Sequence, residues 1–121
     1  MLTRSLIALA VAVLAISVPM ARSDAGVVVE GQADCGLWVK ARTGGTAGYL
    51  EHYLIGLLNG MVMGTGIEFW RAGGVPVSRD QVFLWTDNYC RGEPLSDVVR
   101  GAVLLMNERT GNAWASFHAR R

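Results

Sequence analysis

Apolar residues recur along this chain at the three- and four-residue spacing of helices rather than in the alternation of strands. The most apolar segment runs from Ala47 to Met63, where Leu50, Leu54 and Leu58 form one row at intervals of four. Apolar side chains cover almost the whole circumference of this segment, and this pattern predicts a helix that is buried nearly all round. Gly64 and Gly66 follow it and predict its end.

Two further segments carry start signals for helices. Asp34 precedes a short apolar run and can cap a helix that extends through Lys40. Ser78 is followed three residues later by Gln81, which fits a capping box. We expect the helix that starts there to end near Cys90.

The last periodic segment predicts a final helix. Pro94 suits a first helical turn, where its missing N–H costs nothing. Its apolar face consists of five residues at helical spacing: Leu95, Val98, Ala102, Leu105 and Met106. Gly111 predicts its end, and the tail 112–121 is left unassigned, although Trp114 and Phe117 could pack on the core. The pattern predicts an all-α protein, a small bundle of about four helices.

The first residues read as an export signal. Arg4 precedes the apolar run LIALAVAVLAISV, and Ala21 and Ser23 are small residues placed for cleavage after Ser23. The run is shorter than the roughly 20 residues of a membrane span. We therefore predict a signal peptide over 1–23, a flexible leader over 24–33 and a single helical domain over 34–121. The mature chain is expected outside the inner membrane, in the periplasm, without stable membrane insertion.

Two cysteines, Cys35 and Cys90, lie downstream of this signal, and the sequence contains no other. Two thiols exported to an oxidising compartment, with none to spare, predict one disulfide. That bond would join the first short helix to the end of the capped helix. A mature chain of about 98 residues buries a modest core, so a covalent link of this kind is useful.

The net charge and the small number of reactive side chains argue against nucleic-acid binding, metal binding and catalysis. Removal of Arg4 and Arg22 leaves 9 basic and 10 acidic residues, a net charge near −1, which speaks against nucleic acid as a partner. The two histidines and paired cysteines do not predict a metal site, and no cofactor is expected. Catalysis would need His52, Glu51, Asp87 and Arg91 to converge, without any activated-nucleophile motif. We therefore expect a protein that is not an enzyme.

Two features point to contacts between proteins. Gly56, Gly60 and Gly64 are spaced by four and line one helix edge, which favours close helix packing in the domain or a dimer contact. Phe69, Trp70 and Arg71 fall in a predicted loop, and aromatic residues with arginine are typical of binding hot spots. We expect other proteins as partners, and the glycine edge leaves a homodimer open.

Two motifs together resemble a known group of proteins. The segments YLIGLLNG (53–60) and WTDNYCRGEPL (85–95), with the upstream Cys35, resemble HdeA/HdeB-like periplasmic helical proteins. The segment from Pro76 to Gln81 is also similar to a helix start in Rap/Tai-type immunity proteins of type VI secretion. The resemblance covers about Asp34 to Glu108, and the Cys35–Cys90 bridge is the feature that it transfers by position.

The two resemblances imply different functions. HdeA-like proteins are periplasmic chaperones that loosen in acid and bind client proteins, so the first resemblance implies protection against acid stress. Immunity proteins bind one cognate secreted toxin, such as a cell-wall hydrolase, and block it. The first is our expectation for this chain, and the second is the alternative.

Overall fold

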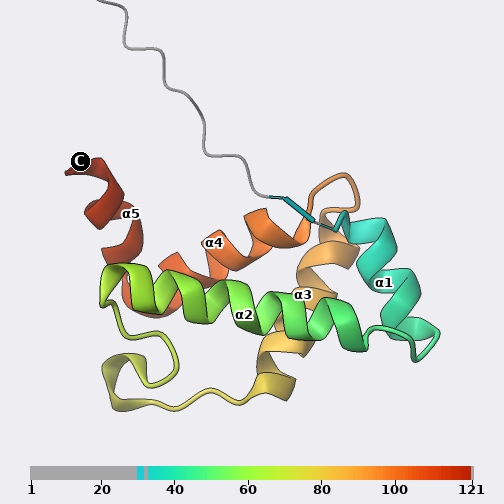
Figure 1. Cartoon of the computed structure of the whole chain (residues 1–121), viewed down its shortest axis with the longest axis horizontal. Coiled ribbons are helices and arrows are strands. Elements are labelled where there is room, and N and C mark those ends of the chain that lie inside the picture. Colours follow the sequence, from blue (N-terminus) through green and yellow to red (C-terminus); the bar gives the residue numbers. More distant parts are fainter. Residues whose placement is uncertain (1–29, 32, 121) are drawn as a thin grey trace, which may run out of the picture.

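The computed structural model describes residues 30, 31 and 33–120. The predicted signal peptide and most of the predicted leader lie outside these residues. Five α-helices follow one another, together with one short 3-10 helix (Figure 1). They are α1 (Cys35–Thr43), α2 (Gly48–Thr65), η1 (Ala72–Gly74), α3 (Arg79–Gly92), α4 (Val98–Thr110) and α5 (Ala113–Ala119). The all-α prediction is confirmed, since the described residues form no strand beyond the isolated bridge between Asp34 and Asp97.

The local start signals act as predicted. Asp34 caps α1 by accepting the N–H of Leu37 at 2.7 Å. Ser78 and Gln81 form both bonds of the capping box at the start of α3. Helix α2 continues to Thr65, slightly beyond the predicted end, and Gly66 closes it with a left-handed φ of 70°. Such a φ strains any residue with a Cβ, so glycine is favoured there.

The prediction that Pro94 lies in the first turn of the final helix is wrong. Residues 93–96 form a tight turn instead, closed by a bond from the Ser96 N–H to the Glu93 carbonyl at 3.0 Å. Asp97 has extended backbone angles and caps α4 by accepting the N–H of Arg100. The helix therefore starts at Val98, because the aspartate offers a capping side chain that Pro94 lacks. The unassigned tail forms α5.

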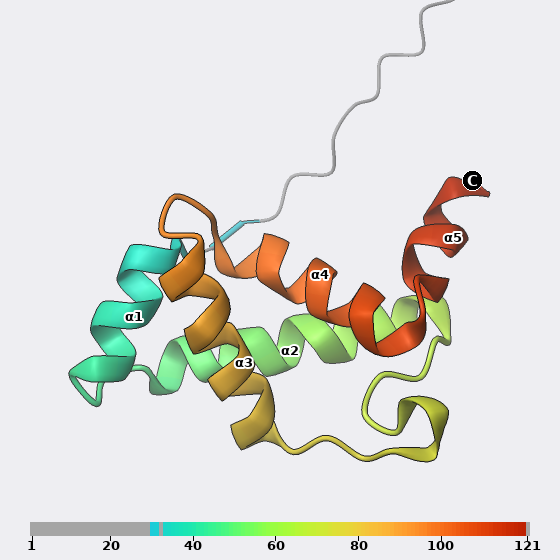
Figure 2. The ribbon, with the colours of Figure 1, turned by 180° about the vertical axis from the view of Figure 1, so that it is seen from behind.

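Helix α4 lies at the centre of the contacts. It packs against α2, α3, α5 and η1, while α1 packs against α3. Figures 1 and 2 show α1 at one end of the molecule and α5 at the other. The start of α1 is also joined to the start of α4, because the Cys35 N–H bonds the Ser96 carbonyl at 3.0 Å and the Val98 N–H bonds the Ala33 carbonyl at 2.9 Å.

The core contains most of the predicted residues but covers α2 incompletely. Trp38, Leu54 and Leu58 are fully buried. Val98, Ala102, Leu105 and Met106 of α4 are buried as predicted. On α2, however, Tyr49 is 63% and Met63 is 85% exposed. The expectation that α2 is buried nearly all round is wrong, since only Leu50, Leu54 and Leu58 are buried. Its other core-packed apolar residues are only partly covered: Ile55, Leu57, Met61 and Val62.

Within the described part of the chain, no helix has the length and apolar character needed to cross a membrane.

Candidate functional site

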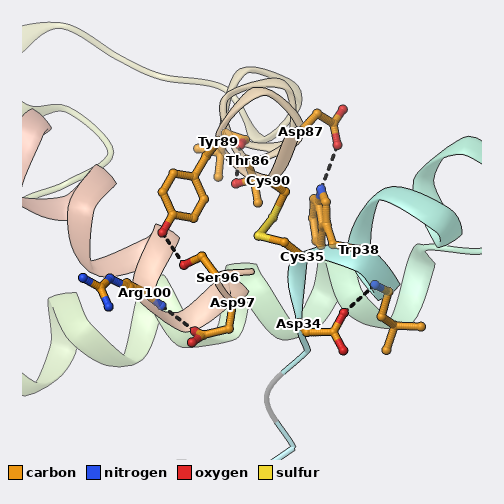
Figure 3. The surroundings of a disulfide bond; sticks show 12 residues. Asp34, Cys35, Trp38, Thr86, Asp87, Tyr89, Cys90, Ser96, Asp97 and Arg100 are labelled. Atoms are coloured by element: carbon orange, nitrogen blue, oxygen red, sulfur yellow. Dashed lines mark hydrogen bonds between the residues drawn. A yellow bond between two sulfur atoms is a disulfide. The ribbon is translucent and has the colours of Figure 1, made fainter. Parts of the chain in front are cut away.

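The predicted disulfide between Cys35 and Cys90 is present (Figure 3). Cys35 is the first residue of α1 and Cys90 lies in the last turn of α3. Both are buried, and Trp38 packs in the same core. Next to the bond, the Tyr89 hydroxyl meets Ser96 Oγ at 2.5 Å, so the turn before α4 is attached to α3 as well. The disulfide therefore lies where α1, α3 and the start of α4 meet.

An ion network that the sequence analysis missed links α1, α2 and α3. Arg42 donates to both carboxylate oxygens of Asp87, each at 3.0 Å, and to Glu51 Oε1 at 2.7 Å. The Trp38 indole N–H also donates to Asp87, at 2.8 Å. Asp87 is only 6% exposed. The hydrogen bond to Asp87, with a further one to Glu51, raises the pKa of Arg42 above its ordinary value, although burial acts in the opposite direction.

The four groups considered for catalysis are not gathered in one cleft. Glu51 and Asp87 approach each other only through Arg42, which pairs with both. His52 is exposed, and its Nδ1 lies 2.7 Å from the Gly48 carbonyl of its own helix. Arg91 is also exposed. The two carboxylates considered for catalysis, Glu51 and Asp87, are thus paired with Arg42.

Most of the predicted binding segment Phe69–Arg71 is buried or forms contacts within the domain. Phe69 is 0% exposed, so the expectation that it can meet a partner in an open loop is wrong. Arg109 holds the loop from α4, since it donates to the carbonyls of Phe69 and Val75 at 3.0 and 2.8 Å. The Trp70 indole donates to Asn59 Oδ1 at 2.8 Å. Arg71 alone of the three predicted residues is exposed.

The glycine edge of α2 does not contact another element. Apart from the adjacent residues and the backbone of α2 itself, a Cβ built at Gly56, Gly60 or Gly64 meets no heavy atom of the described structure within 4 Å. Close packing inside the domain is therefore wrong for these glycines, and a dimer contact stays a prediction. Gly60 and Gly64 line one side of an apolar groove of about 330 Å³, with Trp114 and Phe117 of α5 on the other.

A second surface that the sequence analysis missed is a hollow of about 320 Å³ between α3 and α4. Its lining combines apolar, charged and hydroxyl side chains: Tyr89, Glu93, Leu95, Ser96, Arg100 and Leu104. Leu95, predicted on the apolar face of the final helix, is 101% exposed. A proline in the second position of four residues is a common sequence signal for a β-turn. The segment Glu93–Ser96 has its proline in that position, so this turn could have been predicted.

The described residues contain no group of three or more histidine, cysteine, aspartate or glutamate side chains that could hold a metal ion. No protein-family model, no curated protein and no solved structure matches this chain. The resemblance to HdeA/HdeB-like and Rap/Tai-type proteins therefore stays a prediction.

Proposed function

We propose that this chain is an exported, non-enzymatic protein-binding domain that protects other proteins from aggregation in acid. The proposal extends the resemblance to HdeA/HdeB-like periplasmic proteins. The observation that carries it is the use of carboxylates as structural acceptors throughout the bundle. Loss of these acceptors would act on the fold directly.

Six carboxylates accept hydrogen bonds that define the helices or their contacts. They are Asp34 and Asp97 at helix starts, Glu68 at the Arg71 N–H, Glu51 and Asp87 at Arg42, and Glu108 at the Trp85 indole. Hydrogen bonds to an ionised carboxylate are about twice as strong as neutral ones. An aspartate cap alone stabilises a helix by about 1 kcal/mol.

Acid would act on the whole bundle through its net charge. Protonation of the 10 mature carboxylates and both histidines would change the net charge from about −1 to about +11. Self-repulsion at that charge favours an expanded state. The Cys35–Cys90 bond would keep α1 attached to α3 in that state. The chain would then expose the apolar stripe of α2 without unfolding completely, as compact acid states do.

Export is part of the same proposal. The signal pattern over 1–23 predicts cleavage and release beyond the inner membrane. The disulfide fits an oxidising compartment such as the periplasm, where such bonds persist. Acid reaches the periplasm before the cytoplasm, so a protective protein that responds to acid is useful there.

The test uses the oxidised mature chain from about pH 7 to about pH 2, where carboxylic acids are protonated. We expect near-ultraviolet circular dichroism to disappear, far-ultraviolet signal to persist, and an aggregating client to stay in solution only below that transition. A chain that keeps its tertiary signal at pH 2 and fails to protect the client would refute the proposal.

A pair of variants connects protection to the carboxylate network. Arg42→Ala removes the partner of Glu51 and Asp87, so the loosening and the client protection should both begin at a higher pH than in the wild type. Arg91→Ala removes an exposed arginine that forms no ion pair with a described residue. It should leave unchanged the pH midpoint of the loosening and the pH midpoint of client protection. Equal midpoints in the two variants would contradict a role for the network.

Immunity is the second candidate, and the apolar side chains already exposed in the native fold favour it. Leu95, Met63 and Tyr49 are 101%, 85% and 63% exposed. They lie near the two ends of α2 and in the turn before α4, where a partner of the folded domain could reach them. A chain that stays folded and inactive in acid, and inhibits a purified cell-wall hydrolase at pH 7, would support this candidate over acid protection.

A further inference from the structure

Helix α5 leaves the direction of α4 through a sharp bend. Gly111 and Asn112 both have left-handed φ angles, 59° and 63°, and asparagine is one of the few residues with a side chain that adopt this region readily. Asn107 fixes the bend from α4, because its carbonyl accepts the Asn112 N–H at 2.9 Å and its Oδ1 accepts the Ala115 N–H at 3.0 Å. Figures 1 and 2 both show α5 beside the last turns of α2. Helix α5 is therefore held as the second wall of the apolar groove.

The groove between α2 and α5 has the size of a small-molecule site. Leu57 and Met61 line it from α2, Trp114 and Phe117 line it from α5, and its volume is about 330 Å³. Sites for small molecules measure about 300–1,000 Å³ and have mostly apolar walls. A stable protein partner covers about 20–30 residues, far more than line this groove. The groove therefore suits a small ligand with an apolar body.

One wall of the groove contains a hydrogen-bond donor that lacks an acceptor. The indole N–H groups of the other three tryptophans donate to oxygen atoms of Asp87, Asn59 and Glu108. The indole nitrogen of Trp114 is also buried, yet it has no partner among the described residues. A buried indole N–H usually has an acceptor. This wall therefore lacks an oxygen atom that a ligand in the groove can supply.

The two walls carry no negative charge. Helix α2 contains no aspartate or glutamate after its first turn, and α5 contains none. His118 lines the groove, and Arg120 follows it at the end of α5 without an ion pair to any described residue. Glu68 accepts a backbone N–H of its own loop, and Glu108 accepts an indole N–H from α3. These charges favour a ligand with an anionic group.

We propose that the groove between α2 and α5 binds a fatty acid. The acyl chain would lie against the apolar side chains of Leu57, Met61 and Phe117. The carboxylate would lie at the end where His118 contacts the Trp114 ring, at a centroid distance of 4.1 Å. Its oxygen atoms are acceptors, and its charge complements Arg120. This binding belongs to the folded chain at neutral pH and does not depend on acid protection.

Titration of the oxidised mature chain with decanoate at pH 7, below the micelle concentration, tests the site. We expect one molecule to bind, with a dissociation constant below about 1 mM. Each methylene removed should weaken binding by up to about fourfold, so octanoate binds more weakly than decanoate. Amide shifts in NMR spectra should concentrate in residues 57–65 and 113–118 and include the Trp114 indole N–H. Binding that does not saturate, or shifts confined to other residues, would overturn the proposal.

Two glycine variants locate the ligand on α2. Gly60 lines the groove, whereas Gly56, one turn earlier on the same helix, does not. Beyond the adjacent residues and the α2 backbone, a Cβ at either position meets no described atom within 4 Å. Gly60→Phe should therefore fill the groove and weaken decanoate binding at least about tenfold, while Gly56→Phe binds like the wild type. Far-ultraviolet circular dichroism checks that both variants are folded, and equal affinities would contradict the site.

His118→Glu tests where the carboxylate lies. The new side chain places a negative charge at that end of the groove, so it should weaken decanoate binding by about tenfold. Decan-1-ol has the same chain without the charge, and its affinity should stay unchanged. Equal losses for the two ligands would overturn the placement of the carboxylate. Amide shifts at residues 57–65 that grow with protein concentration, without decanoate, would assign the groove to a second copy of the chain instead.

Discussion

Individual glycines of this chain have opposite roles, and the difference lies in what surrounds their missing Cβ. At Gly101, a Cβ would come within 2.8 Å of Tyr89 Cδ1 and 2.9 Å of Tyr89 Cε1. At Gly56, it would meet no described atom within 4 Å beyond the adjacent residues and the backbone of its own helix. Both residues lie inside helices, so both lower helix propensity relative to alanine. Gly101 alone is required by packing.

We expect Gly101→Ala to destabilise the fold by about 1–3 kcal/mol, since the Tyr89 ring must move away from α4. Gly56→Ala is the matched variant, and it should stabilise the fold by about 0.5–1 kcal/mol through helix propensity. Denaturant unfolding monitored by far-ultraviolet circular dichroism measures both free energies. The same sign for the two variants would contradict the Gly101 contact.

The burial of Tyr53 should make the free energy of unfolding depend on pH in the alkaline range. Its hydroxyl is buried without a hydrogen-bond partner among the described residues, and burial, together with the negative charge of Asp97, raises its pKa above the ordinary value of 10.0. The folded chain then retains the proton after the unfolded chain has lost it. The free energy of unfolding should therefore fall as pH rises above 10.

Tyr53→Phe removes this ionisation, so the decline above pH 10 should become shallower. Near pH 7 the variant should be as stable as the wild type or more so, because it deletes an unpaired buried hydroxyl. Tyr49→Phe, at a residue that is 63% exposed, is the control and should leave the pH profile unchanged. Stability measured by urea unfolding from pH 8 to about pH 11 checks the three profiles.

At the scale of elements, α1, α2 and α3 meet at one cation. Arg42 comes from the last turns of α1, Glu51 from the first turn of α2 and Asp87 from the middle of α3. Asp87 is almost fully buried and accepts three hydrogen bonds, two of them from Arg42. Removal of one partner of such a pair leaves a buried charge without compensation.

We expect Arg42→Ala to lower the free energy of unfolding by about 1–3 kcal/mol. This is less than for a fully buried pair, because the Arg42 side chain is 29% exposed. Glu51→Ala should cost less than about 1 kcal/mol, since that pair is closer to solvent. Chemical denaturation of both variants at pH 7 measures the difference. A larger loss for Glu51→Ala would show that Asp87 is not the main partner.

At the scale of the whole molecule, one covalent bond joins segments that are 55 residues apart. The bridge connects the start of α1 with the end of α3, so it encloses α2 and the loop held by Arg109. Closure of a loop of this length stabilises a fold by about 4 kcal/mol in the chain-entropy model. A domain of this size has only a modest core, so this contribution is a large part of its stability.

We expect the double variant Cys35→Ala/Cys90→Ala to be less stable than the oxidised wild type by about 2–5 kcal/mol. Urea unfolding with and without dithiothreitol measures this loss. The reductant should destabilise the wild type and leave the double variant unchanged, which separates loss of the bond from a general effect of the reagent. Equal midpoints for wild type and variant would contradict a structural role for the bridge.

Local structure and the covalent link could both be predicted from the amino-acid sequence. Helix caps at Asp34 and Ser78 and the helix stop after α2 depend on bonds within a few residues, so their signals are local and readable. The disulfide was predicted from the cysteine count together with the predicted export signal. Four of the five helices were predicted for the same reason, although the start of α4 moved to Val98 because Asp97 caps it better than Pro94 can.

Which apolar and charged residues face inward depends instead on how the helices pack against one another. Leu95 fits the helical period of α4 yet projects from a turn, and Phe69 fits a loop yet lies in the core under Arg109. The Arg42 network and the α3–α4 hollow join side chains far apart in sequence, and no local period records such contacts. Periodicity reports how one helix could orient, whereas its actual orientation depends on what the neighbouring helices cover.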